Sequence, residues 1–180
     1  TRLIHKKRGW KDIEIGLKTA AFSARFKHIN TPKEWDLPPN SYWEQNAIGP
    51  REYSTIHFFR ERSWWWLIRL NDEETSIGLV FEHDGSPLEH PEEIFASRLN
   101  ADQQLSAVVK GATYDKVNSI QQIAYVSAQY HDKGIALIGE SGAFIDPLVG
   151  PGIELIGQQS IYLADLLVKD LVEAKYNANE

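Results

Sequence analysis

The sequence of 180 residues contains no cysteine and no methionine. Without cysteine, the chain can form no disulfide, no thiolate metal site and no cysteine nucleophile. It also lacks an apolar run near the roughly 20 residues that a membrane-spanning helix needs, and a secretory apolar segment at its start. We therefore expect a cytoplasmic protein without a membrane span. Because the chain opens on Thr1 and has no initiating methionine, we expect an internal or C-terminal piece of a longer protein.

Positive charge is scarce, since the formal net charge is −6 at pH 7. Binding to nucleic acid usually needs a basic face. The locally basic stretch, His5 to Arg8 with Lys11, is most simply a solvated turn or helix end. The histidines, at positions 5, 28, 57, 83, 90 and 131, do not have the spacing of metal ligands. We expect no nucleic-acid partner and no metal.

Apolar residues are plentiful, at 42% of the chain, and several stretches alternate in the way strands do. Residues 17–29 predict a half-buried strand with Ala20, Phe22, Ala24, Phe26 and His28 on one side. Residues 53–59 and 64–70, joined by a charged turn, predict a hairpin. Residues 75–81 add a third strand. The connections are too short for crossovers, so this sheet is expected to be antiparallel.

Helical spacing begins after the third of these strands. Residues 91–110 start with proline and two glutamates, which favour a helix start, and predict two helices broken near Asn100. Residues 120–129 predict a further strand, and residues 30–50 a long loop with at most one short helix. The expected fold class is therefore α+β, an antiparallel sheet of about five strands with flanking helices.

The stretch from Gly134 to Leu163 combines several turn and helix signals. The apolar run 135–138 lies between glycines and predicts a short strand buried on both faces. Asp146-Pro147 favours an extended step, because the residue before proline avoids the helical region. The segment 150–152, Gly-Pro-Gly, then predicts the start of a long C-terminal helix. The free amides and partial positive charge of such a helix start favour an anionic group in front of it.

One interpretation of this stretch is a serine hydrolase. Residues 139–143, Gly-Glu-Ser-Gly-Ala, nearly match the nucleophile turn of that class. The motif requires an acid and then a histidine further along the chain. The last histidine is His131, which precedes Ser141, so the triad cannot be completed in the required order. We reject this hypothesis.

A second interpretation comes from resemblance. Residues 134–152 resemble the second FAD fingerprint of the hydroxylase-type flavoproteins, the superfamily of aromatic monooxygenases, flavin-dependent halogenases and geranylgeranyl reductases. Upstream, residues 64–69, Trp-Trp-Trp-Leu-Ile-Arg, are similar to the W-x-W-x-I-P signature of the halogenase-like branch. The resemblance covers nearly the whole chain from about Leu17. It implies that FAD is the cofactor of the parent protein.

The resemblance also implies sites and partners. It implies a small-molecule substrate and, as the source of electrons, a flavin reductase or NAD(P)H. Catalytic residues are not identified by it. The substrate-pocket candidates are His57, Trp64 and Trp66, for which simple sheet packing is an equally good explanation. The implied cofactor-binding residues are Gly139, Glu140, Asp146, Pro147, Gly150, Pro151, Gly152 and Ile153.

Three residues depart from the family pattern. Glu140 replaces the aspartate that holds the ribityl chain, and Arg69 replaces the proline of the tryptophan signature. Pro151 stands where halogenases have serine or threonine and a backbone amide near the halide, and proline has no N–H. The departures at Arg69 and Pro151 favour a monooxygenase or reductase acting on an apolar or aromatic small molecule. A halogenase is the alternative.

The domain organisation follows from the same comparison. We expect residues 1–130 to form the substrate-domain sheet and helices, and residues 131–180 the strand, turn and helix that contact FAD. No G-x-G-x-x-G occurs, so the strand-turn-helix that binds the ADP half of FAD is not in this chain. The isolated segment is expected to be inactive without an N-terminal half. A non-catalytic binding or scaffold protein that keeps this fold is the alternative of another class.

Overall fold

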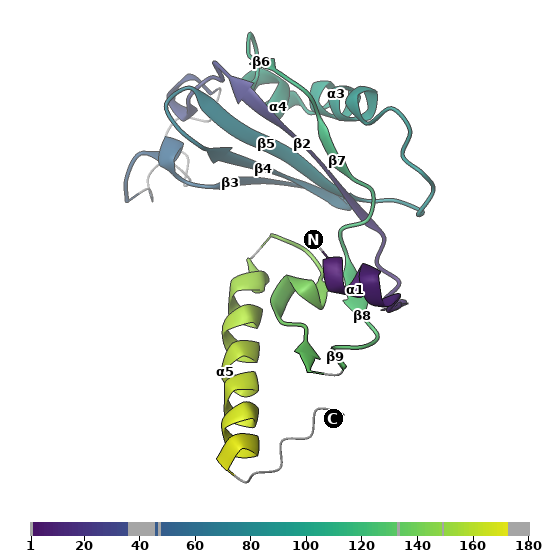
Figure 1. Cartoon of the computed structure of the whole chain (residues 1–180). Coiled ribbons are helices and arrows are strands. Elements are labelled where there is room, and N and C mark those ends of the chain that lie inside the picture. The colour runs from purple at the N-terminus through teal and green to yellow at the C-terminus, as the bar shows by residue number, and fades with distance from the viewer. Residues whose placement is uncertain (1, 36–45, 47, 133, 149, 173–180) are drawn as a thin grey trace. The chain divides into compact units, whose positions relative to one another are not determined.

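The computed structural model describes residues 2–35, 46, 48–132, 134–148 and 150–172 (Figure 1). The chain divides into two compact units, one made of residues 19–122 and the other of residues 1–18 together with 123–180. This division differs from the expected boundary after residue 130. The reason is that β1 (Asp12–Ile13) pairs with β8 (Tyr125–Ser127), which joins the start of the chain to its last third.

The unit of residues 19–122 is built on an antiparallel sheet. The strand order is β3-β4-β5-β2-β6, and β7 also pairs with β2. The predicted strand, hairpin and third strand are confirmed, although Arg51–Tyr53 forms a 3-10 turn, so the hairpin begins at Ile56. The strands are β2 (Thr19–Lys27), β3 (Ile56–Arg60), β4 (Ser63–Arg69), β5 (Glu74–Glu82), β6 (Thr113–Tyr114) and β7 (Asn118–Ile120).

One face of this sheet carries the core. Ala20, Phe22, Ala24 and Phe26 are buried as predicted, whereas His28 has φ of +61° and lies exposed just beyond the end of β2. The buried residues pack with side chains from α3 (Pro91–Ala101) and α4 (Gln103–Val108), which cover that face (Figure 1). The two helices are separated at Asp102, close to the predicted break. The buried helix residues are Phe95, Leu99, Leu105 and Val108, and the ring centroid of Phe95 lies 5.5 Å from that of Trp65 on β4.

The other unit combines small pieces with one long helix. β8 lies between β1 and β11 (Ala143–Phe144), and β9 (His131–Asp132) forms a hairpin with β10 (Ile135–Ala136). α1 (Leu3–Arg8) precedes β1, and a 3-10 turn, η3 (Gly139–Ser141), precedes β11. The predicted long helix is confirmed as α5 (Pro151–Val172). Among the described residues, no helix has both the length and the apolarity to cross a membrane.

The prediction of a strand buried on both faces at residues 135–138 is wrong. Pairing ends after Ala136, which is exposed, and of this run only Leu137 is buried. The Leu137 amide still donates to the Tyr130 carbonyl, in register with the hairpin, whereas the Ile138 amide donates to the hydroxyl of Ser141 and not to a neighbouring strand. Only Ile135 and Ala136 of this run therefore belong to a strand, and the buried Leu137 lies beyond its end.

The predicted strand at 120–129 is also wrong as one element. β7 ends at Ile120 and β8 begins at Tyr125. Between them, the Gln121 side chain bonds both the amide and the carbonyl of Leu88. In the expected loop 30–50, Pro32–Glu34 forms a 3-10 turn (η1), whereas residues 36–45 and 47 lie outside the described residues.

Candidate functional site

The start of α5 is set by a short turn. The Asp146 carboxylate accepts the Leu148 amide at 2.8 Å, and the Gly150 amide donates to the Pro147 carbonyl at 3.2 Å. Gly150 has φ of +63°, a left-handed conformation that favours glycine. Pro151 is then the first helical residue, where its missing N–H costs no hydrogen bond. The amides that follow in the first turn have no acceptor within the helix.

The turn η3 packs against α5 in a way that requires glycine at position 139. Gly139 has φ of +55°, and a Cβ there would lie 2.1 Å from Cγ1 of Ile156. Its amide donates to Oε1 of Gln159 at 2.5 Å. The hydroxyl of Ser141 accepts from the Ile138 amide and donates to the Ile138 carbonyl, which closes the turn. The residues after Gly139 are therefore held beside the first turns of α5.

Glu140 connects this turn to the helix start. Its Oε1 atom lies 2.7 Å from the point that a Cβ on Gly152 would occupy, so the carboxylate sits directly over the Gly152 backbone. Negative charge is favourable at that place because of the helix dipole. The Glu140 carbonyl accepts a hydrogen bond from the hydroxyl of Tyr125 on β8. Glu140 is thus tied at its backbone to the small sheet and reaches α5 with its side chain.

A cavity of about 290 Å³ opens beside the same helix start. Its walls are mainly apolar, and nothing lies within 4 Å of the space that a Cβ on the neighbouring Gly150 would fill. Apolar walls beside free helix amides suit a flat, partly apolar group that carries negative charge at one edge. The lining residues are Ala143, Phe144, Ile145, Pro151, Gly152, Glu154, Leu155 and Gln158.

The structure brings most of the predicted cofactor residues together at this place. Glu140 and Gly152 meet at the helix start, which Pro151 opens, and Gly139 packs against Ile156 further along α5. Asp146, Pro147 and Gly150 form the turn that leads into the helix. Of the predicted residues, Pro151 and Gly152 line the cavity, and Ile153 is 84% exposed. The other predicted residues that are not among its lining residues are Gly139, Glu140, Asp146, Pro147 and Gly150.

Sequence reasoning missed Tyr125 and Gln159, which hold η3 through one hydrogen bond each. They lie 15 and 20 residues from their partners, and no motif marks them.

The predicted substrate residues lie on the other unit, on the sheet face opposite the core. The His57 ring is 5.3 Å from that of Trp64, which is 5.9 Å from that of Trp66. A Cβ on Gly78 would meet the Trp66 ring at 2.1 Å, so the indole lies directly over this glycine. The Trp66 indole N–H donates to the Ser76 hydroxyl at 3.1 Å. The three side chains form one aromatic cluster with Trp66 fixed in place.

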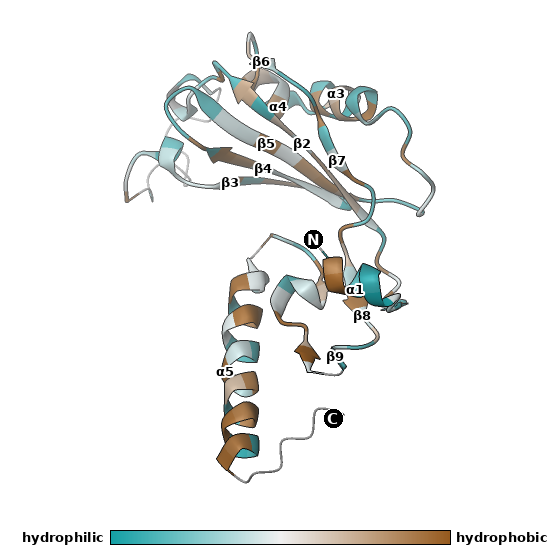
Figure 2. Cartoon of the chain, viewed as in Figure 1, coloured by the Kyte–Doolittle hydropathy of each residue, from teal (hydrophilic) through white to brown (hydrophobic). Residues whose placement is uncertain are grey.

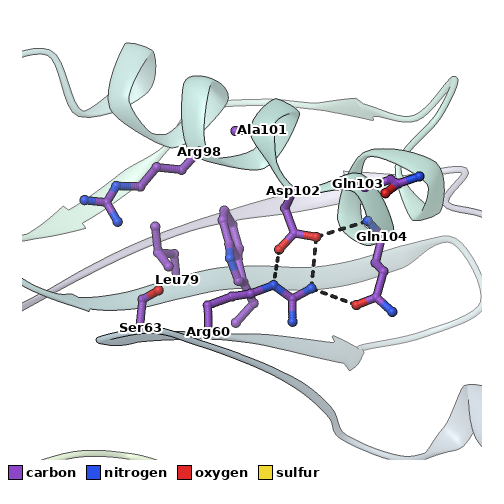
Figure 3. A pocket seen from close by; sticks show the side chains of 9 residues that line it. Arg60, Ser63, Leu79, Arg98, Ala101, Asp102, Gln103 and Gln104 are labelled. Carbon is purple, nitrogen blue, oxygen red and sulfur yellow. Dashed lines mark hydrogen bonds and ion pairs between the residues drawn. The ribbon is translucent and has the colours of Figure 1, made fainter.

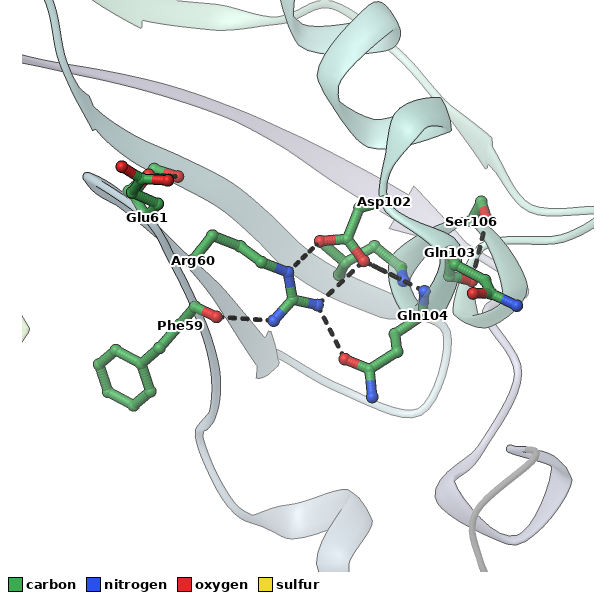
Figure 4. A network of polar contacts seen from close by, with 9 residues as sticks. Phe59, Arg60, Glu61, Asp102, Gln103, Gln104 and Ser106 are labelled. Atoms are coloured by element: carbon green, nitrogen blue, oxygen red, sulfur yellow. Dashed lines mark hydrogen bonds and ion pairs between the residues drawn. The ribbon is translucent and has the colours of Figure 1, made fainter.

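A second hollow, of about 490 Å³, lies between the strands and the helices of the same unit (Figure 3). There the Arg60 guanidinium makes a bidentate ion pair with Asp102, at 2.6 and 3.0 Å, and donates to Gln104 (Figure 4). Asp102 also accepts the amides of Gln104 and Leu105 and so caps α4. These polar groups are occupied in joining α4 to β3, and we assign them a structural role.

Comparisons with known proteins agree with this arrangement. The profile of the family described as tryptophan halogenase matches residues 43–180. The "Tryptophan 2-halogenase" of Chondromyces crocatus is 30% identical over 168 residues, which is 87% of this chain and 30% of that protein. "Flavin-dependent halogenase armH1" of Armillaria mellea is 29% identical over 111 residues, which is 53% of this chain and 21% of that protein.

Solved halogenase structures share the fold. The crystal structure of halogenase PltM superposes with a TM-score of 0.77 at 22% identity, over 95% of this chain and 36% of PltM. The myxobacterial chondrochloren halogenase CndH superposes with a TM-score of 0.68 at 16% identity, over 94% of this chain and 37% of CndH. The chain thus spans well under half the length of the proteins it matches. The family profile covers most of the chain, which therefore belongs to the tryptophan halogenase family.

Proposed function

We propose that the protein containing this chain is an FAD-dependent oxidoreductase that acts on an apolar or aromatic small molecule. The observation that carries the proposal is the apolar cavity of about 290 Å³ beside Pro151 and Gly152, at the start of α5. Relatives in the family are named flavin-dependent halogenases, and PltM has been solved with phloroglucinol and FAD. The residues of this chain fit such a group, because Gly150 leaves open space and the cavity borders the first turn of α5.

Each residue at the helix start has a proposed task. The amides of Gly152 and Ile153 favour an electron-rich edge of the flavin, because they belong to the first turn of α5. Phe144 and Leu155 provide apolar walls. The Glu140 carboxylate, already beside Gly152, accepts hydrogen bonds from the sugar-like part of the cofactor. When bound, FAD supplies the redox chemistry, while the protein supplies orientation and electrostatics.

For the substrate, we propose the aromatic cluster of His57, Trp64 and Trp66. Its rings are held by ring contacts and by the indole hydrogen bond to Ser76, so they form a rigid group in which Trp64 is buried and His57 and Trp66 are half-buried. This assignment makes the sheet unit of residues 19–122 the substrate-side part of the protein, and it gives the contact with FAD to residues 131–180 of the other unit. Electrons would come from a flavin reductase or NAD(P)H.

Position 151 bears on the reaction. The relatives are named halogenases, so halogenation is the alternative activity. Proline at the first position of α5 gives no N–H to an anion in front of the helix. The start of α5 therefore offers a halide one backbone hydrogen-bond donor fewer than a helix start without proline does. On this ground we favour oxygenation or reduction of the substrate.

The cofactor site is tested by replacing one glycine. In the full-length protein, Gly152→Trp places an indole where Glu140 and the cavity now lie, and we expect flavin absorbance of the purified protein to be lost. Gly157→Trp is the matched control on the same helix, because nothing lies within 4 Å of its Cβ position. Equal flavin content in the Gly152→Trp protein and the control would place the flavin elsewhere.

The reaction is tested by turnover. We expect the full-length protein, given reduced flavin, oxygen and a panel of indoles and phenols, to yield oxygenated or reduced products. Chloride and bromide are present in parallel reactions, and products are identified by mass spectrometry. A halogenated product would contradict our interpretation of Pro151. If no substrate is changed and no flavin is bound, a scaffold protein becomes the better explanation.

A further inference from the structure

Tyr125 occupies an unusual place in the smaller sheet. It lies on β8 and donates its hydroxyl proton to the main-chain carbonyl of Glu140. Its ring stacks on Phe144, with centroids 6.4 Å apart and planes 24° from parallel. The Arg2 guanidinium lies 4.2 Å from the centroid of the same ring. The ring is therefore held by contacts that do not involve the hydroxyl, which leaves the hydroxyl free to act on Glu140.

Arg2 is itself fixed. Its guanidinium forms an ion pair with Asp12, and the same carboxylate oxygen lies 3.0 Å from Nε2 of the buried His5. The start of the chain thus reaches the Glu140 turn through one tyrosine. Burial raises the pKa of the Tyr125 hydroxyl, and the neighbouring Arg2 only partly opposes this. The hydroxyl accordingly remains a proton donor through the neutral range.

Besides its own backbone hydrogen bonds, the turn that carries Glu140 is held by the side chains of Gln159, Ser141 and Tyr125. Gln159 binds the Gly139 amide, Ser141 closes the turn on Ile138, and Tyr125 binds the Glu140 carbonyl. The first two lie on either side of Glu140, and the third acts on Glu140 itself. The orientation of its peptide sets the direction in which the side chain leaves the turn. That side chain places a carboxylate over Gly152, at the start of α5.

We propose that Tyr125 is a positioning residue for the flavin site: its hydroxyl fixes the Glu140 peptide and thereby aims the Glu140 carboxylate at the space in front of α5. This inference rests on the proposed function, in which that carboxylate contacts FAD. Tyr125 itself does not touch the cofactor, and its effect passes through Glu140.

The decisive variant is Tyr125→Phe in the full-length protein. Phenylalanine keeps the contacts with Phe144 and Arg2 and removes only the donor to Glu140. We expect hydrogen exchange at the amides of Ser141 and Gly142 to become about 2- to 12-fold faster, the range for one hydrogen bond of ordinary net strength. Tyr162→Phe is the control, because Tyr162 lies exposed on α5. Unchanged exchange in Tyr125→Phe overturns the positioning role, whatever flavin binding shows.

A double-mutant cycle separates positioning from general stability. FAD affinity, measured by titration, is expected to fall about 3- to 10-fold in Tyr125→Phe, and Glu140→Ala is expected to lower it at least as much. In the Glu140→Ala background, Tyr125→Phe should then have no further effect. An equal effect in both backgrounds means that Tyr125 does not act through the carboxylate and overturns the inference. If the unaltered protein binds no FAD, the proposed function fails, and with it the role toward the cofactor.

Discussion

Asp102 joins two segments that lie more than 40 residues apart. It caps α4 through the amides of Gln104 and Leu105, and it binds Arg60, at the end of β3, through both carboxylate oxygens (Figure 4). Its side chain is 7% exposed, whereas that of Arg60 is 35% exposed. Burial alone raises the pKa of Asp102, but the hydrogen bonds from Arg60, Leu105 and Gln104 outweigh it and lower the pKa below its ordinary value.

Removing this carboxylate should therefore cost stability. We expect Asp102→Ala to lower the free energy of unfolding by about 2 kcal/mol, since it loses both the cap and the ion pair, which solvent partly screens. Asp102→Asn keeps a capping oxygen and should cost about 1 kcal/mol. Chemical denaturation measures both, with exposed Asp115→Ala as the control, expected within about 0.5 kcal/mol of the unaltered protein. If the Asp102 variants lose no more unfolding free energy than Asp115→Ala does, the structural role of Asp102 is contradicted.

The same pair predicts a dependence on pH. Because the pKa of Asp102 is lowered in the folded protein, its stabilisation is present above the unfolded pKa of about 3.9. It is lost as the pH falls through the folded pKa. The stability difference between the unaltered protein and Asp102→Asn should accordingly shrink as the pH is lowered from about 6 to below 3. A difference that stays constant over this range would mean that the charge of Asp102 is not what stabilises the pair.

At the scale of single elements, the sequence pattern was sufficient to predict secondary structure where one face of a strand or helix packs against a core. The alternation in β2 places Ala20, Phe22, Ala24 and Phe26 in the core, as the sequence predicts. The helix break was also predictable, because residues 91–110 are too polar near Asn100 to continue one apolar stripe. In these segments the buried positions recur with the period of the strand or helix, and this period can be read from the spacing of apolar residues in the sequence.

The sequence pattern did not predict the strand ends where the backbone forms hydrogen bonds with side chains or with distant backbone groups. The run 135–138 resembles a buried strand, yet only Ile135 and Ala136 form strand pairs, and the Ile138 amide donates to the Ser141 hydroxyl and not to a neighbouring strand. The expected strand at 120–129 is interrupted in a similar way, where the Gln121 side chain forms hydrogen bonds with the amide and the carbonyl of Leu88. Such contacts depend on which residues meet in space, so spacing along the chain cannot reveal them.

α5 shows the same limit in the packing of a helix. Its apolar residues recur with rough helical spacing, which predicted the helix correctly (Figure 2). Within the described part of the chain, however, none of its side chains is fully buried, and Ile153, Leu166 and Leu171 are 84%, 59% and 71% exposed. Periodicity predicts that a helix has an apolar face and does not identify what that face contacts. The same holds for the candidate site, where the glycine and proline positions were predictable and the supporting Tyr125 and Gln159 were not.

At the scale of the whole chain, one of the two compact units is a continuous segment of the sequence and the other is not. All residues of the core cluster between the sheet and its two helices belong to the continuous segment 19–122. The other unit is discontinuous in sequence. In it, β8 pairs with β1 from the start of the chain, and the Tyr125 ring contacts the Arg2 guanidinium. Short sheets whose strands have two or three residues bury little apolar surface of their own. Independent folding is therefore expected of the first unit and not of residues 123–180 alone.

We predict that a protein of residues 19–122 unfolds cooperatively on heating, with a near-ultraviolet dichroism signal from the buried Trp65, whereas residues 123–180 show no cooperative transition. The physical reason is the shared core, in which Phe22, Phe95 and Leu105 are fully buried. As a control for specific packing, Leu105→Ala in the excised segment should cost about 2 to 5 kcal/mol and strongly lower its melting temperature. A gradual transition that Leu105→Ala does not change would show that this unit depends on the rest of the chain to fold.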